Sequence, residues 1–186
     1  MLLQNYIKIF NNILADEENN ALNKIVKNLE YKTAATVGGV NTNVRNTQIY
    51  GLNELDKSLT MIHWLNFLNY MFKQFSEMYK KVTLSNYLFF RPHARFDLQI
   101  LKYESGGFYD VHVDHAEEVP RTLSFVYFIN DDYEGGNLHF ILEKNNVVTV
   151  EKKRNSLVIF PSNFLYPHTV EPVTKGTRYT VVGWAL

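Results

Sequence analysis

The N-terminal part of the chain has the hydrophobic spacing of helices, and the remainder has that of strands. Between residues 22 and 29 apolar side chains fall at i, i+3, i+4 and i+7, which predicts a helix that Asp16 could cap. A second helix is predicted from about residue 56 to residue 80, because apolar residues recur along its whole length and suit packing on a sheet. Residues 2–10, before the first helix, predict a strand.

From residue 84 onward, short alternating or β-rich runs replace the helical spacing. Gly, Pro, Asn and Asp residues punctuate these runs, as expected for turns between strands. The runs are LSNYLFF, RFDLQILKY, FYDVHVD, TLSFVYFIN, NLHFIL, NVVTV, SLVIF and RYTVVGWAL. Eight strands at this spacing predict an α+β, mainly β fold, either a β-sandwich or a double-stranded β-helix (jelly roll), supported by N-terminal helices.

The length and the connecting segments favour one domain. A chain of 186 residues that is 46% hydrophobic and 15% aromatic is long enough to bury a sizeable core. Residues 1–83 would provide the N-terminal support, and residues 84–186 would form the jelly-roll core. The Gly-, Thr- and Asn-rich residues 33–53 between the two helices predict a mobile loop flanking short strands.

The charge balance restricts the class of partner. Nineteen basic and nineteen acidic side chains give a formal net charge of zero, so no bulk electrostatic case exists for nucleic acid or an anionic membrane. No stretch approaches the roughly 18 apolar residues of a spanning helix, and the N-terminus lacks the apolar segment of a signal peptide. We therefore expect a cytoplasmic protein. The chain has no cysteine, so any metal must be held by His, Asp or Glu.

The stretch FYDVHVDHAEEV contains the first candidate chemistry. Side chains alternate along a strand, so His112 and Asp114 point to one face while His115 points to the other. One imidazole and one carboxylate can reach a common ion at about 2.0–2.2 Å. His168, which follows Pro167 at the start of a late strand, is the candidate third ligand. Two His and one Asp on one side of an octahedron leave open positions, which suits Fe(II) oxygen chemistry.

A candidate anion site follows ten residues after His168. Arg178 and Thr180 lie two positions apart, hence on one face of a strand. A guanidinium grips a carboxylate through two hydrogen bonds, and the hydroxyl adds another donor. A dicarboxylate co-substrate would suit this arrangement, with one end at the metal and the other at Arg178. Tyr103, on the strand before the metal strand, could donate its hydroxyl to the same carboxylate.

Three segments in order resemble the 2-oxoglutarate- and Fe(II)-dependent dioxygenases, and most closely the prolyl 4-hydroxylase group. The segments are LQILKYESGGFYDVHVD, RTLSFVYFINDDYEGGNLHF and LVIFPSNFLYPHTVEPVTKGTRYTVVGW. The resemblance covers roughly residues 95–186. It implies that His112, Asp114 and His168 ligate Fe(II), and that Arg178 binds the distal carboxylate of 2-oxoglutarate.

The resemblance also implies roles for several other residues. Tyr103 and Thr180 would assist at the 2-oxoglutarate carboxylate, and Trp184 would wall the metal pocket or the substrate entrance. Tyr109 and Tyr127 are candidates for either pocket walls or core. Collagen-type prolyl hydroxylases usually have Lys where this chain has Arg178, which weakens the case for collagen as the substrate.

The implied reaction is hydroxylation of an unactivated C–H bond, most simply of a peptidyl-proline, while 2-oxoglutarate is decarboxylated to succinate. The implied cofactors are Fe(II), 2-oxoglutarate as co-substrate and O2, with ascorbate as a candidate reductant. The expected partner is a protein or peptide substrate, which residues 33–53 could cover.

Three alternatives stay open. One is a hydroxylase of a free amino acid or other small molecule. Another is a nucleic-acid base demethylase, for which Arg45, Arg91 and Arg95 could form a local basic patch. The third, of a different class, is a non-catalytic jelly-roll domain that binds a metal or ligand without turnover.

Overall fold

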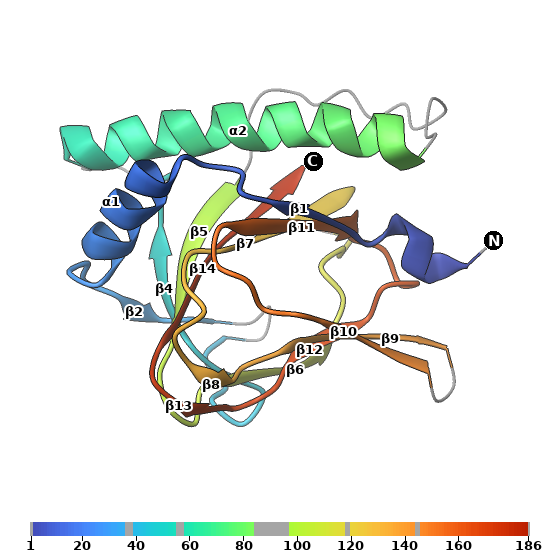
Figure 1. Ribbon diagram of the computed structural model, residues 1–186. Coiled ribbons are helices and arrows are strands. Elements are labelled where there is room, and N and C mark those ends of the chain that lie inside the picture. Colours follow the sequence, from blue (N-terminus) through green and yellow to red (C-terminus); the bar gives the residue numbers. More distant parts are fainter. Residues whose placement is uncertain are drawn as a thin grey trace.

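The computed structural model describes residues 2–35, 39–54, 58–83, 97–117, 120–143 and 146–185. Two antiparallel sheets face each other, and two helices pack on the outer face of the larger sheet (Figure 1). The mainly β class predicted from the strand spacing is confirmed. The predicted strand LSNYLFF, together with Arg91 and Arg95, lies outside the described residues.

The larger sheet contains both N-terminal and C-terminal strands. Its order is β1 (Lys8–Asn11), β11 (Ser156–Pro161), β7 (Leu123–Phe128), β14 (Arg178–Ala185), β5 (Asp97–Tyr103), β4 (Gln48–Gly51) and β2 (Lys32–Thr33). The smaller sheet has the order β10 (Asn146–Val150), β9 (Leu138–Glu143), β12 (His168–Val170), β6 (Phe108–His112) and β3 (Arg45–Asn46). A short ribbon pairs β8 (Glu134–Gly135) with β13 (Val173–Lys175).

Helices α1 (Asp16–Val26) and α2 (Leu59–Thr83) cover the larger sheet, and α2 runs along it for its whole described length (Figure 1). Asp16 is the first helical residue rather than the cap. Ala15 occupies the cap position, and its N–H donates to the Glu18 carboxylate at 2.9 Å. The predicted N-terminal strand is shorter than expected, because a 3-10 turn, η1 (Leu3–Tyr6), precedes β1.

Two hydrophobic cores lie on opposite faces of the larger sheet. One fills the space between the sheet and the helices, and the other lies between the two sheets. All six residues of β7 are buried because both of its faces are covered. Gly183 on β14 lets α2 approach closely, since a Cβ there would meet Leu98 at 2.5 Å and Phe72 at 3.1 Å. Phe72 instead stacks on Phe125, with ring centroids 5.2 Å apart.

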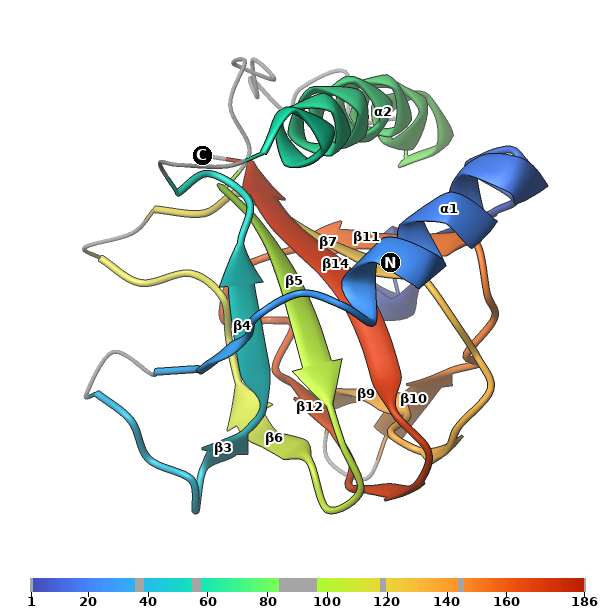
Figure 2. The same cartoon turned by 90° about the vertical axis from the view of Figure 1, so that its left-hand side faces the viewer.

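The described residues of the segment 33–53 contribute strands to both sheets. β3 pairs with β6 of the smaller sheet, and β4 pairs with β5 of the larger one. The chain crosses between the sheets at Thr47, whose hydroxyl donates to the Lys102 carbonyl at 2.9 Å. Figure 2 shows β3 and β4 beside β6 and β5 at this edge of the sandwich. Short strands were expected here, but their pairing with the chemistry-bearing β6 was not.

Among the described helices, none is both long and apolar enough to span a membrane.

Candidate active site

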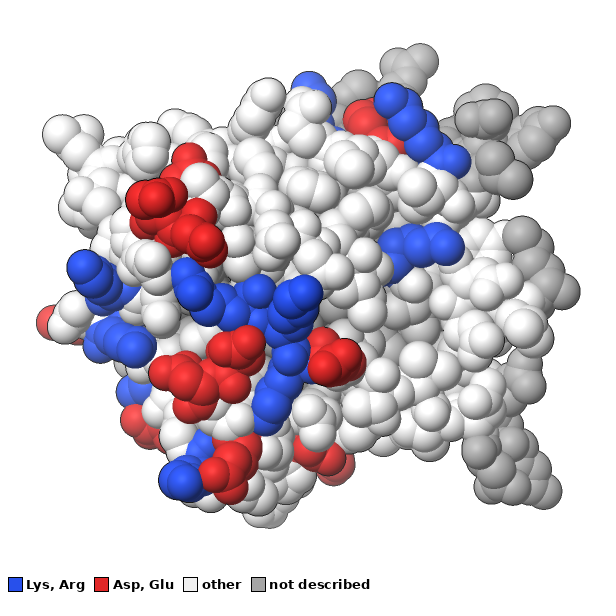
Figure 3. Space-filling model, viewed as in Figure 1, with Lys and Arg blue, Asp and Glu red and all other residues white. Residues whose placement is uncertain are grey.

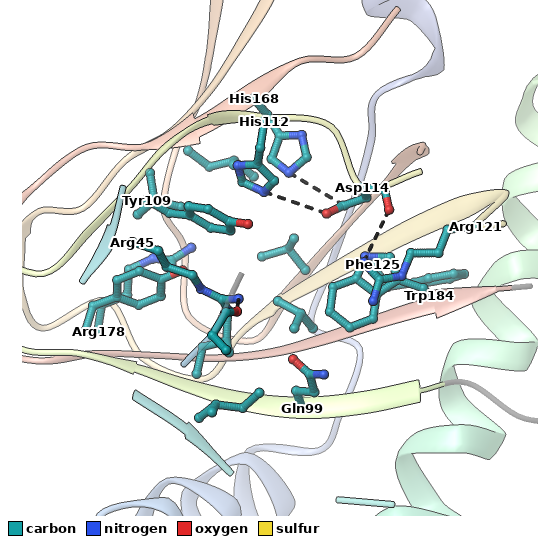
Figure 4. A pocket seen from close by; sticks show the side chains of 18 of the residues that line it. Arg45, Gln99, Tyr109, His112, Asp114, Arg121, Phe125, His168, Arg178 and Trp184 are labelled. Carbon is teal, nitrogen blue, oxygen red and sulfur yellow. Dashed lines mark hydrogen bonds and ion pairs between the residues drawn. The ribbon is translucent and has the colours of Figure 1, made fainter. Parts of the chain in front are cut away.

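His112, Asp114 and His168 converge at one end of the space between the sheets (Figure 4). The pairing of β12 with β6 sets His168 directly opposite His112. Their imidazole Nε2 atoms lie 3.7 Å (His112) and 3.6 Å (His168) from the two carboxylate oxygens of Asp114. The three donor atoms all lie within 4.8 Å of one another. The hydrogen-bonded part of β6 ends at His112, yet the alternation continues, so Val113 is exposed while Asp114 points inward.

Backbone carbonyls fix the orientation of both imidazoles. Nδ1 of His112 lies 2.8 Å from the Asp110 carbonyl, and Nδ1 of His168 lies 3.0 Å from the Tyr166 carbonyl. A carbonyl can only accept, so each Nδ1 carries the proton and each Nε2 presents its lone pair to the site. Burial, and then the proximity of His168, lowers the pKa of His112 to about 3. Its imidazole is therefore neutral near pH 7, as a metal ligand must be.

Asp114 is held in its charged form by hydrogen bonds and neighbouring imidazoles. Burial alone would raise its pKa, but His168, His112 and hydrogen bonds from Ser124 and Trp184 together hold the pKa below its usual value. The Ser124 hydroxyl donates to Asp114 Oδ2 at 2.6 Å and contacts the Ser162 hydroxyl at 2.8 Å. Sequence reasoning missed Ser124. The available signal was one hydroxyl within the apolar run LSFVYF.

Arg178 is a buried cation without an acidic partner among the described residues. Its side chain is 1% exposed, and its Nε has no hydrogen-bond partner. Nη1 reaches the Thr180 hydroxyl at 3.4 Å, and the guanidinium lies 4.8 Å from the ring centroid of Tyr103. Thr180 and Tyr103 therefore both contact Arg178, as their positions in the sequence predicted. An unpaired buried guanidinium is costly, so this site needs an anion.

Tyr133 is a neighbour of Arg178 that sequence reasoning missed. Its hydroxyl is buried and has no hydrogen-bond partner. Burial raises the pKa of Tyr133, while the charge of nearby Arg178 opposes that shift. Gly136 permits this approach, since a Cβ there would meet both Tyr133 and Arg178. Gly135 belongs to strand β8, and the tyrosine two residues before it lies beside Arg178.

A cavity of about 430 Å³ connects the two groups of residues, with the triad and Arg178 both in its wall. Tyr109 and Trp184 also line it, as proposed from the sequence. Tyr109 stacks on His112 with ring centroids 3.6 Å apart. The His115 side chain is exposed and bonds to the Arg121 carbonyl, consistent with its assignment to the opposite face.

Tyr127 does not line this cavity but belongs to the core between the larger sheet and the helices. Its hydroxyl accepts from the Asn19 amide at 2.7 Å and donates to the Asn155 side chain at 3.2 Å. Asn155 in turn bonds both backbone groups of Leu14, at 3.0 and 2.8 Å. Of the two tyrosines left open between wall and core, Tyr109 is wall and Tyr127 is core.

Replacing Tyr127 with Phe should lower stability without changing the site. The change removes the hydrogen bonds of the hydroxyl to Asn19 and Asn155, although Asn19 keeps the Ile129 carbonyl and Asn155 keeps Leu14, so we expect a cost of about 0.5–1.5 kcal/mol. Thermal or urea unfolding would measure this loss, and the affinity for 2-oxoglutarate should stay as in the wild type. A weakened affinity for 2-oxoglutarate with unchanged stability would contradict the core placement.

Known proteins match this chain in sequence and in fold. The model of the "2OG-Fe(II) oxygenase superfamily" matches residues 98–186. A PKHD-type hydroxylase of Crocosphaera subtropica is 30% identical over 186 residues, which cover 96% of this chain and 77% of that protein. The chain belongs to the 2OG-Fe(II) oxygenases.

Other relatives are more nearly identical to this chain, but over a shorter aligned stretch that covers less of their own length. A PKHD-type hydroxylase of Gloeothece citriformis is 36% identical over 120 residues, covering 60% of this chain and 53% of the relative. For several of the curated relatives of this oxygenase, the match thus spans about half of their length or less.

Solved structures share the fold. A Pseudomonas putida prolyl-4-hydroxylase superposes with a TM-score of 0.74 at 21% identity, covering 96% of this chain and 91% of that one. A Trichoplax adhaerens prolyl hydroxylase, solved with a peptide fragment of a hypoxia inducible factor, gives 0.74 at 19% identity, covering 97% and 83%. The predicted jelly roll is confirmed for this oxygenase.

The family implies Fe(II), 2-oxoglutarate and O2, and the residues of this oxygenase fit the metal and the dicarboxylate. Two imidazoles and one carboxylate form the donor set typical of non-haem Fe(II) sites. The unpartnered Nε of Arg178 and hydroxyl of Tyr133 fit the far carboxylate of a dicarboxylate.

Proposed function

We propose that this protein is a dioxygenase that hydroxylates an unactivated C–H bond, that of a peptidyl-proline, while converting 2-oxoglutarate to succinate and CO2. One observation carries the proposal. A convergent His, Asp and His set and an unpaired buried arginine face the same cavity, which suits a dicarboxylate that spans the distance between them.

In this proposal His112, Asp114 and His168 hold Fe(II) through Nε2, a carboxylate oxygen and Nε2. The bound iron would supply O2 activation, with ascorbate as the reductant that restores Fe(II). The protein supplies the rest. Asp110 and Tyr166 carbonyls orient the imidazoles, and Ser124 orients the carboxylate, as second partners of metal ligands usually do.

Arg178 would bind the distal carboxylate of 2-oxoglutarate, with Thr180, Tyr103 and Tyr133 around it. Support comes from burial and from the free donors. The guanidinium is almost fully enclosed, so its charge acts in surroundings with little water. Aromatic rings of Tyr103 and Phe128 flank it at 4.8 and 5.3 Å, which holds the donor edge in place.

A peptide substrate is supported by a similar structure that contains a peptide and by the residues that line the cavity. The Trichoplax adhaerens structure contains a peptide fragment. In this chain Thr33, Ala35 and Arg45, from the segment predicted to cover substrate, line the cavity beside the triad. Residues 36–38 of that segment lie outside the described residues. Trp184 and Val126 supply apolar wall that excludes water from the reacting C–H bond.

The test is a turnover assay with a library of proline-containing peptides in the presence of Fe(II), 2-oxoglutarate, O2 and ascorbate. We expect stoichiometric succinate and a peptide mass gain of about 16 Da, one oxygen atom. Succinate without a modified peptide, but with a modified free amino acid, would favour the small-molecule alternative. Absence of succinate under all conditions would contradict catalysis.

A further inference from the structure

The cavity is positively charged although the whole chain is neutral. Among the described residues that line it, four are basic, and Asp114 is the one acid. Figure 3 shows that on one outer face, by contrast, basic and acidic side chains are interspersed. Asp114 is engaged by the two imidazoles and Ser124. Lys32 pairs with Glu54, which lies outside the cavity, whereas the three arginines make no ion pair among the described residues.

Arg45 is fixed in place but keeps one donor edge free. β3 pairs Arg45 with Tyr109, and its guanidinium lies 4.5 Å from the Tyr109 ring centroid. Nη1 donates to the Ala35 carbonyl at 3.2 Å, whereas the buried Nε has no hydrogen-bond partner. Tyr109 stacks in turn on His112. The stack thus holds a cation one ring away from a proposed iron ligand.

Arg121 repeats this arrangement on another wall of the cavity (Figure 4). Its guanidinium lies 3.7 Å from the ring centroid of Trp184, and Nη1 donates to the Asp114 backbone carbonyl at 3.3 Å. Its Nε is also buried and unpartnered. Burial lowers the pKa of Arg121, the charges of Asp114 and Asp97 oppose that shift, and the proximity of Arg45 adds a smaller lowering contribution. The two guanidinium groups therefore lie within electrostatic reach of each other.

These two arginines are in excess of what 2-oxoglutarate needs. Its distal carboxylate is accounted for by Arg178, and its other end by the metal. Unpaired cations in a half-buried cavity lose hydration without gaining a partner, so a bound anion would be favourable. The free edge of a guanidinium offers two parallel N–H donors, which match the two oxygens of a carboxylate.

We propose that Arg45 and Arg121 bind a carboxylate of the peptide substrate, so that the oxidised residue has an acidic group beside it. This rests on the proposed function, because it places the substrate next to the triad. The carboxylate belongs either to an Asp or Glu side chain or to the C-terminus of the peptide. Both sources present the same planar group.

Calorimetric binding to protein loaded with Mn(II) and 2-oxoglutarate tests this without turnover. The probes are N-acetylated Ala-Xaa-Pro-Xaa-Ala peptides with Xaa as Glu or Gln, each as the amide and as the free acid. We expect the Glu amide to bind about tenfold or more tighter than the Gln amide. Equally tight binding of the Gln free acid would assign the site to a chain terminus. Equal affinity of all four peptides, or no binding, would overturn the proposal.

Variants identify the residue responsible. Arg45→Gln should reduce the ratio of the affinities for the Glu and Gln peptides to about one. Arg45→Lys should retain part of this preference, because Lys keeps the charge but not the two parallel N–H donors. Lys175→Gln, which removes an exposed lysine paired with Glu134, is the matched control and should keep the full ratio. A full ratio in both Arg45 variants would overturn the assignment.

The same peptides with Fe(II) and O2 separate this inference from the proposed function. A Glu preference in binding without any peptide mass gain would refute proline hydroxylation and leave the carboxylate site supported. Mass gain on Glu and Gln peptides with equal kcat/KM would support hydroxylation and refute the carboxylate site.

Discussion

Asp114→Ala should abolish both Fe(II) binding and 2-oxoglutarate turnover. Asp114 is the one carboxylate in the triad, and both imidazole Nε2 atoms lie within 3.7 Å of its oxygens. Without it, two imidazoles remain, and the positive charge of the ion has no counter-charge in the described wall of the cavity. Changing a group that only orients a metal ligand costs about 10–100-fold in affinity or activity. Loss of a ligand should therefore exceed about 100-fold. Metal titration and succinate release would measure the two effects.

Ser124→Ala should weaken Fe(II) binding less than Asp114→Ala does. It removes the 2.6 Å hydrogen bond to Asp114 but leaves the carboxylate in place. We expect a loss of about 10–100-fold in Fe(II) affinity, clearly smaller than that of Asp114→Ala. His112→Ala and His168→Ala should match Asp114→Ala. Full Fe(II) binding and activity in any of the three triad variants would refute the ligand assignment.

The triad was predictable from local sequence because strand geometry acts over short distances. His112 and Asp114 are two residues apart, so alternation alone places them on one face. The partner His168 needed more, since fifty-six positions separate it from His112. Its pairing opposite His112 follows from sheet topology, which the ordered motifs of the family resemblance implied and residue spacing did not.

The positions of Arg45 and Arg121 in the cavity wall could not be predicted from the local sequence. Arg45 was considered only as a member of a surface patch with Arg91 and Arg95. It reaches the cavity because two residues of β3 pair with β6 at the edge of the smaller sheet. A two-residue strand leaves no periodic signal in a sequence. Arg121 and Tyr133 likewise enter the site from connections between strands, where side-chain direction has no fixed period.

The direction of the Tyr127 side chain could not be predicted, because the strand that contains it is apolar on both faces. All six residues of β7 are buried, so hydrophobicity does not distinguish the face toward the helices from the face toward the cavity. The distinction follows from parity with Ser124, which bonds Asp114 and therefore points inward. Tyr127, three positions later, must point outward toward α1, as its bond with Asn19 shows.

Arg178→Met should raise the KM for 2-oxoglutarate strongly and also make the ligand-free protein at least as stable as the wild type. Truncating one partner of a buried hydrogen-bonded charge pair costs about 2–5 kcal/mol. That corresponds to a rise in KM of roughly 30-fold or more. The stability effect has the opposite sign, because without 2-oxoglutarate the buried guanidinium has no acidic partner among the described residues. Replacing an uncompensated buried charge with an apolar side chain removes a desolvation penalty.

Thermal unfolding with and without 2-oxoglutarate separates a binding role from a structural one. Ligand binding to the folded state should raise the melting temperature of the wild type but not of Arg178→Met. Arg178→Lys should fall between them in KM, since Lys keeps the charge and loses the two-pronged contact. Lys175→Gln, at an exposed lysine three residues away, should behave as the wild type in both measurements. A destabilised Arg178→Met protein whose KM for 2-oxoglutarate is unchanged would show that Arg178 stabilises the fold. Arg178 would then not be the residue that binds 2-oxoglutarate.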